Sequence, residues 1–380
     1  MKFDIYSLEK TYDQFKEKSI SSRVFRYVEL LVEFKKHQNF YTIDPIGYSV
    51  ERRKVFKLSW GIGQKKVMIW SQMHGDETTG TTALLDVLNF FQENDPLAQF
   101  LNARLDISFI PMLNPDGAEN FQRRNAIDID LNRDARALQS PEIRILFDQV
   151  QQFRPDILFN LHDQRSMYHV GSTPKPAVFS FLAPAEDAQR TITKNRKKTM
   201  GFIACIEKQL SLLIPGMIGR YSDEFYPTAT GDCFQQLGYP CILFEAGYYP
   251  NDLQKQQSRK YNALAVLAGF YTLAVEEDLG QYYQYYLSIP ENGKKLFDKI
   301  YRQMKIRKGS IELTVDIGLM IEERYNIRTH ELNFILRIVE IGDLRQFFGR
   351  EEIQTDGKFY LGEDGSTYPQ LGGSDAFQLV

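Results

Sequence analysis

The sequence lacks the features that would assign it to several classes of protein. It has no run of about 18 uncharged apolar residues, so no membrane-spanning helix is expected. It has no low-complexity tract and no internal repeat, which excludes fibrous and solenoid architectures. The net charge is only -3 and no block of like charges occurs, so neither a nucleic acid nor a membrane is expected as a partner. These absences favour a small partner.

Cysteine is also scarce, and no export signal is expected. The three cysteines, Cys205, Cys233 and Cys241, show no CxxC spacing, and the opening segment MKFDIYSLEKTYDQF carries charges throughout. Such a chain is expected in the cytoplasm, where disulfides are rare. We therefore interpret the three thiols as buried side chains, neither metal ligands nor nucleophiles.

What the sequence does contain indicates a globular protein. With 380 residues, 43% of them hydrophobic, one large core and a second small domain are expected. Apolar residues at helical spacing predict an amphipathic helix over residues 22–37. From residue 45 onward, short β-rich runs alternate with helical stretches, which predicts an α/β fold with a mostly parallel sheet. Strands are expected at residues 54–60, 66–72, 105–113, 157–161, 177–183 and 241–246, and helices at residues 82–94, 140–153, 188–211 and 252–275.

Polar side chains follow four of these strands, at the point where each strand ends. The run KVMIWSQ leads into His74 and Glu77, LDISFIPML into Asn114, DILFNL into His162, and CILF into Glu245. The carboxyl ends of parallel strands share one edge of an open sheet, and ligands bind at that edge. One polar strand end means little, because a turn follows every strand. Four of them, holding two of the five histidines, predict a functional site.

The residue types at this edge are those of a catalytic zinc site. Zinc commonly takes two His and one Glu and keeps a fourth position for water, so His74, Glu77 and His162 are candidate ligands. The proton of an activated water must be collected, and Glu245 is the candidate. Asp130 is a candidate to orient the metal-bound imidazole of His74. His74 and Glu77 alone would be typical of a capped helix N-terminus, but the full set favours a metal site.

The segment over residues 114–134 adds candidates for substrate binding. Asn132 and Arg133 place an amide beside a guanidinium, a combination suited to a carboxylate. Either Arg123 or Arg124 is a candidate to polarise a carbonyl and to hold the oxyanion that forms. The alternative is a solvated basic loop, which the letters RRN alone would suggest.

The motifs HGDE, NPDG, DLNR and FEAG, in this order, carry a resemblance to a known family. With an Arg ahead of DLNR and a His after an apolar strand, they resemble the zinc carboxypeptidases of the carboxypeptidase A type over roughly residues 45–275. The resemblance implies a doubly wound α/β fold, with helices on both faces of a mostly parallel or mixed sheet. It also implies a zinc metallopeptidase that hydrolyses the amide bond next to a free carboxyl terminus, in a peptide or peptide-like substrate.

The resemblance also assigns roles to the candidate residues. It selects Arg123 as the carbonyl polariser, because its distance of nine residues from Asn132 matches the family pattern RxNxxGVDLNR better than Arg124 does. The other implied roles are one zinc ion on His74, Glu77 and His162, general base and then acid for Glu245, and binding of the terminal carboxylate for Asn132 and Arg133.

The chain departs from the family pattern near the substrate. An Asp and an Ala follow Arg133, where the family often has Asn and an aromatic residue. The tyrosine that commonly closes over the substrate has no clear counterpart. Tyr226 is our candidate and Tyr248 and Tyr249 are rivals, while simple packing is the alternative for each of them.

The last hundred residues differ in character from the α/β part. The segment ENGKKLFDKIYRQMK predicts a helix, and residues 306–325 and 330–343 predict alternating strands. We expect a catalytic domain over residues 1–279, whose residues 1–40 form an N-terminal helical extension. Residues 280–380 are expected to form a small α+β appendage.

Two other functions compete with that of a carboxypeptidase. One is a zinc-dependent amidohydrolase of small N-acyl amino acids, as in the related desuccinylase and aspartoacylase branch, although the motif NPDG resembles the peptidases more. The other is a binding module without turnover. The presence of every metal and acid/base position argues against such a module.

Overall fold

The computed structural model describes residues 2–380, and its backbone contacts divide the chain into two compact units. The first unit holds the residues up to Gln164 together with Ala177–Asn292. The second holds Arg165–Pro176 together with Gly293–Val380. Each unit encloses hydrophobic clusters of its own. The division into functional domains at residue 280 stays a prediction.

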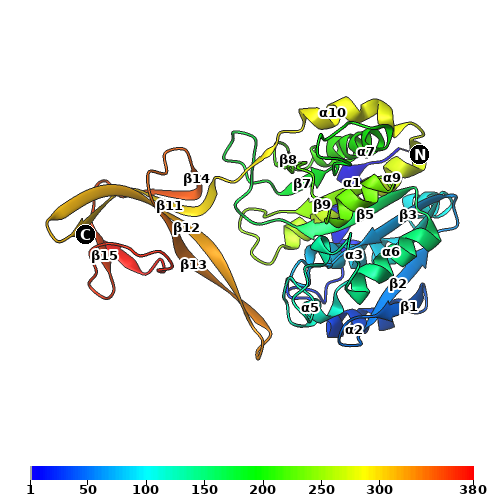
Figure 1. Ribbon diagram of the computed structural model, residues 1–380, viewed down its shortest axis with the longest axis horizontal. Helices are drawn as coiled ribbons and strands as arrows, with labels where there is room; N and C mark the ends of the chain where they lie inside the picture. The colour runs from blue at the N-terminus through cyan, green and yellow to red at the C-terminus, as the bar shows by residue number, and fades with distance from the viewer. Residues whose placement is uncertain (1) are drawn as a thin grey trace. The chain divides into compact units, whose positions relative to one another are not determined.

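The first unit is built on an eight-stranded mixed sheet (Figure 1). The strands β4, β3, β5 and β9 lie side by side and run parallel, while antiparallel pairs occur toward both edges. Parallel strands are buried on both faces, which explains their continuous apolar runs in the sequence. In sheet order, the strands are β1 (Thr42–Tyr48), β2 (Lys54–Trp60), β4 (Leu105–Ile110), β3 (Lys65–Trp70), β5 (Ile157–Asp163), β9 (Cys241–Ala246), β7 (Phe179–Leu182) and β8 (Ile218–Arg220).

Helices cover both faces of this sheet (Figure 1). Alternate residues of a central strand enter different hydrophobic clusters: Val67 packs with α3, α7 and α9, whereas Met68 packs with α6 and α8. This is the two-sided arrangement expected from the sequence. The helices are α1 (Ile5–Phe15), α2 (Tyr27–His37), α3 (Thr79–Gln92), α4 (Pro96–Asn102), α5 (Pro115–Glu119), η1 (Leu131–Arg133), α6 (Pro141–Phe153), α7 (Lys194–Leu210), α8 (Thr230–Gln236), α9 (Gln256–Val275), η2 (Leu279–Tyr282) and α10 (Tyr283–Ser288).

Capping residues set where the helices begin. Helix α6 begins at Pro141, one residue after the predicted start, with Ser140 at the N-cap position; the Ser140 hydroxyl donates to Asp134 at 2.6 Å and makes no capping bond. Helix α2 begins at Tyr27, five residues later than predicted. The delay has a local cause, because the Glu29 carboxylate accepts from the backbone N–H of Arg26 at 2.8 Å and from its guanidinium at 2.6 Å. These bonds close the first turn at Arg26.

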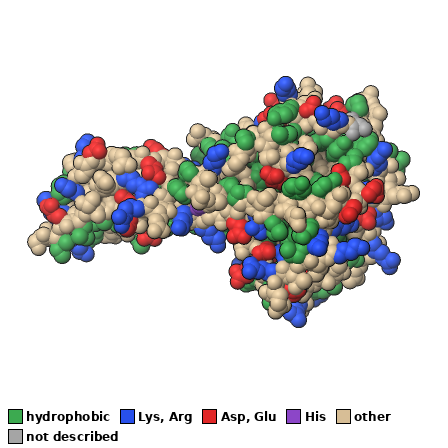
Figure 2. All heavy atoms as spheres, turned by 90° about the horizontal axis from the view of Figure 1, so that it is seen from above, with side chains coloured by type: hydrophobic (Ala, Val, Ile, Leu, Met, Phe, Trp, Pro, Cys, Tyr) green, Lys and Arg blue, Asp and Glu red, His purple; other side chains and the backbone are tan. Residues whose placement is uncertain are grey.

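The surface agrees with the even charge distribution in the sequence. Figure 2 shows basic and acidic side chains interspersed over the face that it presents, with no large area of one sign. Among the helices of the described residues, none combines the length and the apolar content that a membrane crossing requires.

A buried ion pair ties the N-terminal segment to the core. Asp86 of α3 and Arg259 of α9 are at most 1% exposed, and Arg259 Nε donates to Asp86 at 2.7 Å. Arg259 also donates to the carbonyl oxygen of Ile20 at 2.8 Å. Asp86 accepts from the backbone N–H of Glu17 at 2.7 Å and from the Tyr12 hydroxyl. The pair therefore fastens α1 and the residues after it onto α3 and α9.

We expect Arg259→Met to lower the free energy of unfolding of the first unit by about 3–5 kcal/mol, because Asp86 would stay buried without its cation. The double variant Asp86→Leu/Arg259→Met should recover most of the loss, since an apolar pair carries no charge to desolvate. Urea unfolding followed by tryptophan fluorescence measures both, because Trp60 and Trp70 both belong to the first unit. An equal loss in the single and double variants would contradict this explanation.

The second unit is built from strands. Its main sheet has the order β13-β12-β11-β14, in which β11 and β14 run parallel and the other pairs antiparallel. Within Gly293–Val380, all of which the structure describes, no helix occurs. The strands are β6 (His169–Val170), β10 (Asn292–Gly293), whose first residue is the last of the first unit, β11 (Leu296–Lys308), β12 (Ile311–Asn326), β13 (Glu331–Gly342), β14 (Phe348–Gln354), β15 (Tyr360–Gly362) and β16 (Phe377–Leu379).

The helix predicted over residues 291–305 is wrong, because most of this segment forms β11. A β-bulge between Tyr301 and Met304, with Gln303 at a φ of 56°, shifts the alternation of the strand. The strand also contributes to two hydrophobic clusters. Its apolar residues therefore do not alternate with polar ones as they do in a half-exposed strand. The apolar residues therefore recur at a spacing typical of a helix: Leu296, Phe297, Ile300, Tyr301 and Met304.

The segment Arg165–Pro176 follows β5 in the sequence but packs within the second unit. Arg350 of β14 donates to the carbonyl oxygen of Ser166. The His169 ring lies 5.2 Å from the Phe348 ring, measured between centroids. Burial lowers the pKa of His169, which agrees with a packing role for this histidine.

Candidate metal centre and active site

Three side chains that the sequence placed at two strand ends meet in the structure. Ligand atoms of His74, Glu77 and His162 all lie within 4.8 Å of one another, and the three residues are buried. Nδ1 of His74 is 2.8 Å from Oε1 of Glu77, and Nδ1 of His162 is 2.8 Å from Oε2. The Glu77 carboxylate therefore lies between the two imidazoles.

A tight turn explains how one short segment supplies two of these side chains. His74 and Glu77 lie between β3 and α3, where the Glu77 N–H donates to the His74 carbonyl oxygen at 3.1 Å. Glycine is required at position 75, because a Cβ on Gly75 would lie 2.0 Å from the carbonyl carbon of Gly117. The third side chain, His162, comes from β5, the parallel neighbour of β3.

Two further charged side chains hold the candidate ligands. Asp130 Oδ1 lies 3.0 Å from Nε2 of His74, where an orienting carboxylate is expected. Arg123 donates from Nη1 to Glu77 at 2.9 Å and from Nε to Asp130 at 3.2 Å. Arg124 instead donates to a backbone carbonyl of its own loop at 2.7 Å. The structure therefore brings Arg123, and not Arg124, to the cluster.

The electrostatics of the cluster favour a positive charge at its centre. Burial alone would lower the pKa of His74, but the charge of Glu77 and the hydrogen bond to Asp130 raise it to about 9. Burial alone would raise the pKa of Glu77, yet the two histidines hold it well below its ordinary value. A carboxylate that stays ionised while buried needs a cation beside it, either a proton on imidazole or a metal ion.

The donor set fits zinc. Two imidazole nitrogens and a carboxylate are the ligands of a common catalytic zinc site, which keeps a fourth position for water. Nδ1 of His74 is buried and makes no hydrogen bond, although Oε1 of Glu77 lies 2.8 Å away. Nε2 of the same ring is already held by Asp130. An imidazole fixed on one side and left without a partner on the other has the arrangement of a metal ligand.

Glu245 lies on the strand next to that of His162. The strands β9 and β5 are parallel, and the Cα atoms of Glu245 and His162 are partners in their register. Paired residues on neighbouring strands point to the same face, so Glu245 shares a face with His162. Burial, followed by the charge of Glu77, raises the pKa of Glu245 well above its ordinary value. A raised pKa suits a group that exchanges protons near neutral pH.

A buried ion pair that the sequence did not reveal lies next to these residues. Nζ of Lys255 is 3.0 Å from Oδ2 of Asp163, and their side chains are 5% and 4% exposed. The Asp163 N–H donates to Glu77 at 3.1 Å, and Lys255 also donates to the carbonyl oxygen of Ala246 at 3.4 Å. Lys255 thus joins the ends of β5 and β9. Asp163 could have been found because it follows His162, whereas nothing in the sequence marks Lys255.

The predicted carboxylate-binding residues lie in the short helix η1. Asp130 caps this helix by accepting from the N–H of Asn132 at 2.9 Å. The Asn132 side chain in turn accepts from the N–H of Thr230 at 2.8 Å. Arg133 is exposed, and its guanidinium carbon lies 4.4 Å from the centre of the Tyr226 ring. The same carboxylate therefore orients a candidate ligand and positions this pair.

The structure separates the three tyrosine candidates. Tyr226 is 49% exposed and lies against Arg133. Tyr248 is buried, and the ring of Tyr249 packs against that of Tyr261 with centroids 5.7 Å apart. Of the three, Tyr226 is therefore the one that lies exposed beside Arg133.

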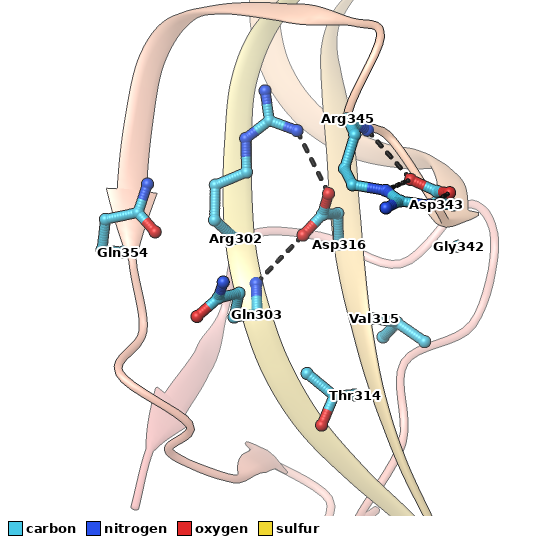
Figure 3. Close-up of a pocket in the computed structure, with 9 residues that line it drawn as sticks. All are labelled: Arg302, Gln303, Thr314, Val315, Asp316, Gly342, Asp343, Arg345 and Gln354. Carbon is cyan, nitrogen blue, oxygen red and sulfur yellow. Dashed lines mark hydrogen bonds and ion pairs between the residues drawn. The ribbon is translucent and has the colours of Figure 1, made fainter.

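A hollow in the second unit collects other charged side chains (Figure 3). Arg302 donates to Asp316 at 3.1 Å, and Arg345 pairs with Asp343 at 2.5 Å (Figure 3). Arg302 also pairs with Glu352 at 2.9 Å. These charges neutralise one another, so the hollow lacks the unpaired ligand atoms that distinguish the histidine cluster.

Sequence comparison matches part of the first unit to known proteins. Residues 27–155 match a family model described as zinc carboxypeptidase. Carboxypeptidase 2 of Trichophyton rubrum is 33% identical over 101 residues, which cover 26% of this chain and 19% of that protein. Carboxypeptidase SOL1 of Arabidopsis thaliana is 30% identical over 138 residues, 29% of this chain and 28% of that protein. Cytosolic carboxypeptidase 6 of Homo sapiens is 30% identical over 109 residues, 26% of this chain and 22% of that protein. The chain thus spans between 19% and 28% of the length of these relatives.

Solved structures show the same fold. A metallo-carboxypeptidase from Burkholderia cenocepacia aligns with a TM-score of 0.51 at 19% identity, over 64% of this chain and 68% of that chain. A metallo-carboxypeptidase from Pseudomonas aeruginosa, in complex with (2-guanidinoethylmercapto)succinic acid, aligns with a TM-score of 0.52 at 16% identity, over 66% and 69%. These matches confirm the α/β fold class and, together with the family match, the resemblance seen in the sequence motifs.

Proposed function

We propose that this chain is a zinc metallopeptidase, which its match to the zinc carboxypeptidase family model supports, and that it hydrolyses the amide bond next to the free carboxyl terminus of a peptide or peptide-like substrate. One observation carries the proposal: His74, Glu77 and His162 meet within 4.8 Å, and Glu245 is the register partner of His162. A single zinc ion held by the three side chains belongs to the proposal. When bound, zinc supplies a Lewis acid that activates water and polarises a carbonyl.

In this mechanism Glu245 moves the protons. Its carboxylate accepts a proton from the attacking water and then gives it to the leaving amine, so one group serves as base and as acid. Burial disfavours the charged form and so raises the pKa of Glu245, which makes its carboxylate a stronger base than an exposed one.

Arg123 stabilises the negative charge that develops on the carbonyl oxygen. Its side chain is 42% exposed. Glu77 holds it through Nη1 and Asp130 through Nε. A guanidinium has five N–H groups, which is more than these two contacts use. Donors held in place before the reaction stabilise an oxyanion without reorganisation.

Asn132 and Arg133 bind the terminal carboxylate of the substrate. The planar guanidinium of Arg133 matches a carboxylate in charge and in shape, and the neighbouring amide adds a further donor. The Asn132 side chain is fixed by its bond to Thr230 at 2.8 Å, which prepares it for binding. Holding the carboxylate places the scissile amide at the histidine cluster.

We expect Arg133→Met to raise KM by about 10- to 100-fold with little change in kcat, because a charge-assisted contact present before and during the reaction is lost. Steady-state kinetics on one peptide, with its terminus free and with its terminus amidated, measures the effect. Only the free peptide should be affected. The matched control is Arg136→Met, which changes another exposed arginine of the same loop and should leave KM unaltered. Equal losses on both peptides would contradict the assignment.

Digestion of a mixed peptide library by the zinc-loaded protein tests the reaction. Mass spectrometry should show the loss of single residues from free carboxyl termini. Release of acyl groups from N-acyl amino acids, with the peptides left intact, would replace the proposal by the amidohydrolase alternative, which the carboxypeptidase names of the relatives do not favour. Zinc binding without hydrolysis of any amide would indicate a binding module.

The cytoplasmic location expected from the sequence stays a prediction. The name of one relative, cytosolic carboxypeptidase 6, agrees with it. Fractionation of the native host, with an antibody against the chain, measures the location.

A further inference from the structure

Three buried polar side chains near the histidine cluster have no hydrogen-bond partner. Both amide atoms of Asn160 are unpaired, as are Nε1 of Trp70 and the hydroxyl of Thr230. All three residues are 0% exposed. Leaving a buried polar group unpaired is unfavourable, so such groups usually have a partner, which here the protein itself does not provide.

The sheet places two of these side chains next to the candidate ligands. Trp70 of β3 is the register partner of Asn160 of β5, which is in turn the partner of Leu243 of β9. Two residues further along the same strands, His162 is the partner of Glu245. Residues two apart on a strand share a face. Asn160 therefore lies about 7 Å from His162 along β5, on the same face as the candidate ligands.

Helix α8 packs against the strands on both sides of Asn160. A Cβ on Gly231 would lie 2.6 Å from Cδ1 of Leu243, and the ring centroids of Phe234 and Trp70 are 5.8 Å apart. The helix therefore contacts the neighbours of Asn160 on both sides, and the amide between them points toward it.

The third unpaired group, the hydroxyl of Thr230, lies on this helix and faces the sheet near Asn160. Thr230 precedes Phe234 by four residues, so its side chain shares a helix face with Phe234, which packs against Trp70 of the sheet. The Thr230 N–H donates to Asn132 at 2.8 Å. The unpaired groups thus lie between a candidate metal ligand and a candidate carboxylate binder.

We propose that Asn160, Thr230 and Trp70 form the subsite for the side chain of the substrate's C-terminal residue, and that this side chain is polar and uncharged. The inference rests on the proposed function, which puts the scissile carbonyl at His162 and the terminal carboxylate at Asn132. The side chain of the last residue branches from the carbon between these two groups. It is therefore directed toward the unpaired groups, which lie between His162 and Asn132.

The chemistry of the three groups selects the class of side chain. They offer N–H and O–H donors together with the acceptor oxygens of Asn160 and Thr230, and none of them is charged. An amide or hydroxyl side chain can satisfy donors and acceptors at once. An aliphatic side chain would leave them unpaired, and an ionised one would be buried without a counter-ion. The carboxylate of Asp232 lies on the same helix and is engaged by the N–H of Tyr226, from which it accepts at 3.1 Å.

Hydrolysis of peptides that differ only in the last residue tests the subsite. With the zinc-loaded full chain, kcat/KM for a terminal Gln should exceed that for a terminal Leu, Glu or Lys by at least about 100-fold. Asn160→Leu keeps the branched shape of the side chain and removes both polar amide atoms, so it should reverse the preference between Gln and Leu. Thr230→Val is a second variant, which should weaken the preference for Gln without reversing it. Metal content should stay unchanged in both.

The chain offers a matched control. Asn262 of α9 is also 0% exposed, with both amide atoms unpaired, but it lies among the helices on the opposite face of the sheet. Asn262→Leu makes the same chemical change there and should leave the ratio of Gln to Leu unaltered. A wild-type preference for Leu, or an unchanged ratio in Asn160→Leu, would overturn the subsite and would mean that the amide holds buried water or has a structural role.

A binding measurement separates this inference from the proposed function. Calorimetric titration of the zinc-loaded protein with free glutamine and free leucine, the products of such cleavage, needs no turnover. The wild type should bind glutamine at least tenfold more tightly, and Asn160→Leu should remove the difference. Absence of hydrolysis together with selective binding of glutamine would refute the carboxypeptidase activity and retain the subsite. Hydrolysis of peptides without selective binding of glutamine would retain the carboxypeptidase activity and refute the subsite.

Discussion

Replacing Glu245 by glutamine is expected to lower kcat by about 10³-fold while zinc stays bound. Glutamine has nearly the shape of glutamate but can neither accept the proton of water nor deliver it to the leaving amine. Glu245 is not among the side chains whose ligand atoms cluster within 4.8 Å, so its replacement removes no donor to the metal. Kinetics on a peptide substrate and elemental analysis of the purified protein give the two readouts.

A matched control distinguishes the loss of a proton carrier from a general effect of removing a carboxylate. Burial also raises the pKa of Glu207 on α7, and Glu207 is not one of the clustered ligands. Glu207→Gln should therefore keep full activity. Turnover near the wild-type rate in Glu245→Gln would show that another group moves the proton.

The central part of the fold could be predicted from the sequence, because each buried strand is a continuous apolar run with turn residues at its ends. The predicted strands at residues 54–60 and 241–246 coincide with β2 and β9. The edge strand β1 was missed, since it contains a proline and a glycine and is mostly exposed. Pairing with β2, and not its own pattern, makes this segment a strand.

The candidate site was predictable to the extent that its residues end strands or lie in motifs. His74, Glu77, His162 and Glu245 follow apolar runs, and the topology of a parallel sheet brings such ends together. Contacts between segments far apart in the sequence leave no such signal. The ion pair of Lys255 with Asp163 joins residues 92 apart. In the sequence, Asn160 is not distinguished from the other residues of a buried strand, and only its neighbours in the structure show that its amide is unpaired.

The choice between Arg123 and Arg124 shows the same limit. Consecutive residues of an irregular loop point in different directions, and composition does not tell which one turns inward. Only the spacing of the family pattern selected Arg123, and the structure gives it contacts with Glu77 and Asp130. The bulge in β11 is a further case, because one shifted residue makes a strand resemble a helix in the spacing of its apolar residues.

Glu77→Gln is expected to weaken zinc binding by at least about 100-fold and to abolish turnover with it. Each carboxylate oxygen of Glu77 lies 2.8 Å from one imidazole, and Oε1 also accepts from Arg123 at 2.9 Å. A glutamine would place an NH2 group at one of these oxygens, where it offers the metal no lone pair and, at the position of Oε1, meets the donor of Arg123. The variant would also remove the negative charge that holds a cation among two histidines and an arginine.

Zinc titration with a competing chelator measures this affinity, and Asp76→Asn is the matched control. Asp76 is the adjacent residue, and burial together with the charge of Glu77 raises its pKa to about 6, so it resembles Glu77 in position but not in its contacts. We expect Asp76→Asn to keep its zinc. The two glutamate variants then separate the two roles, since Glu245→Gln should hold zinc without turnover and Glu77→Gln should have neither. Full zinc occupancy in Glu77→Gln at the wild-type affinity would place the metal on other side chains, and the proposed mechanism would lose its centre.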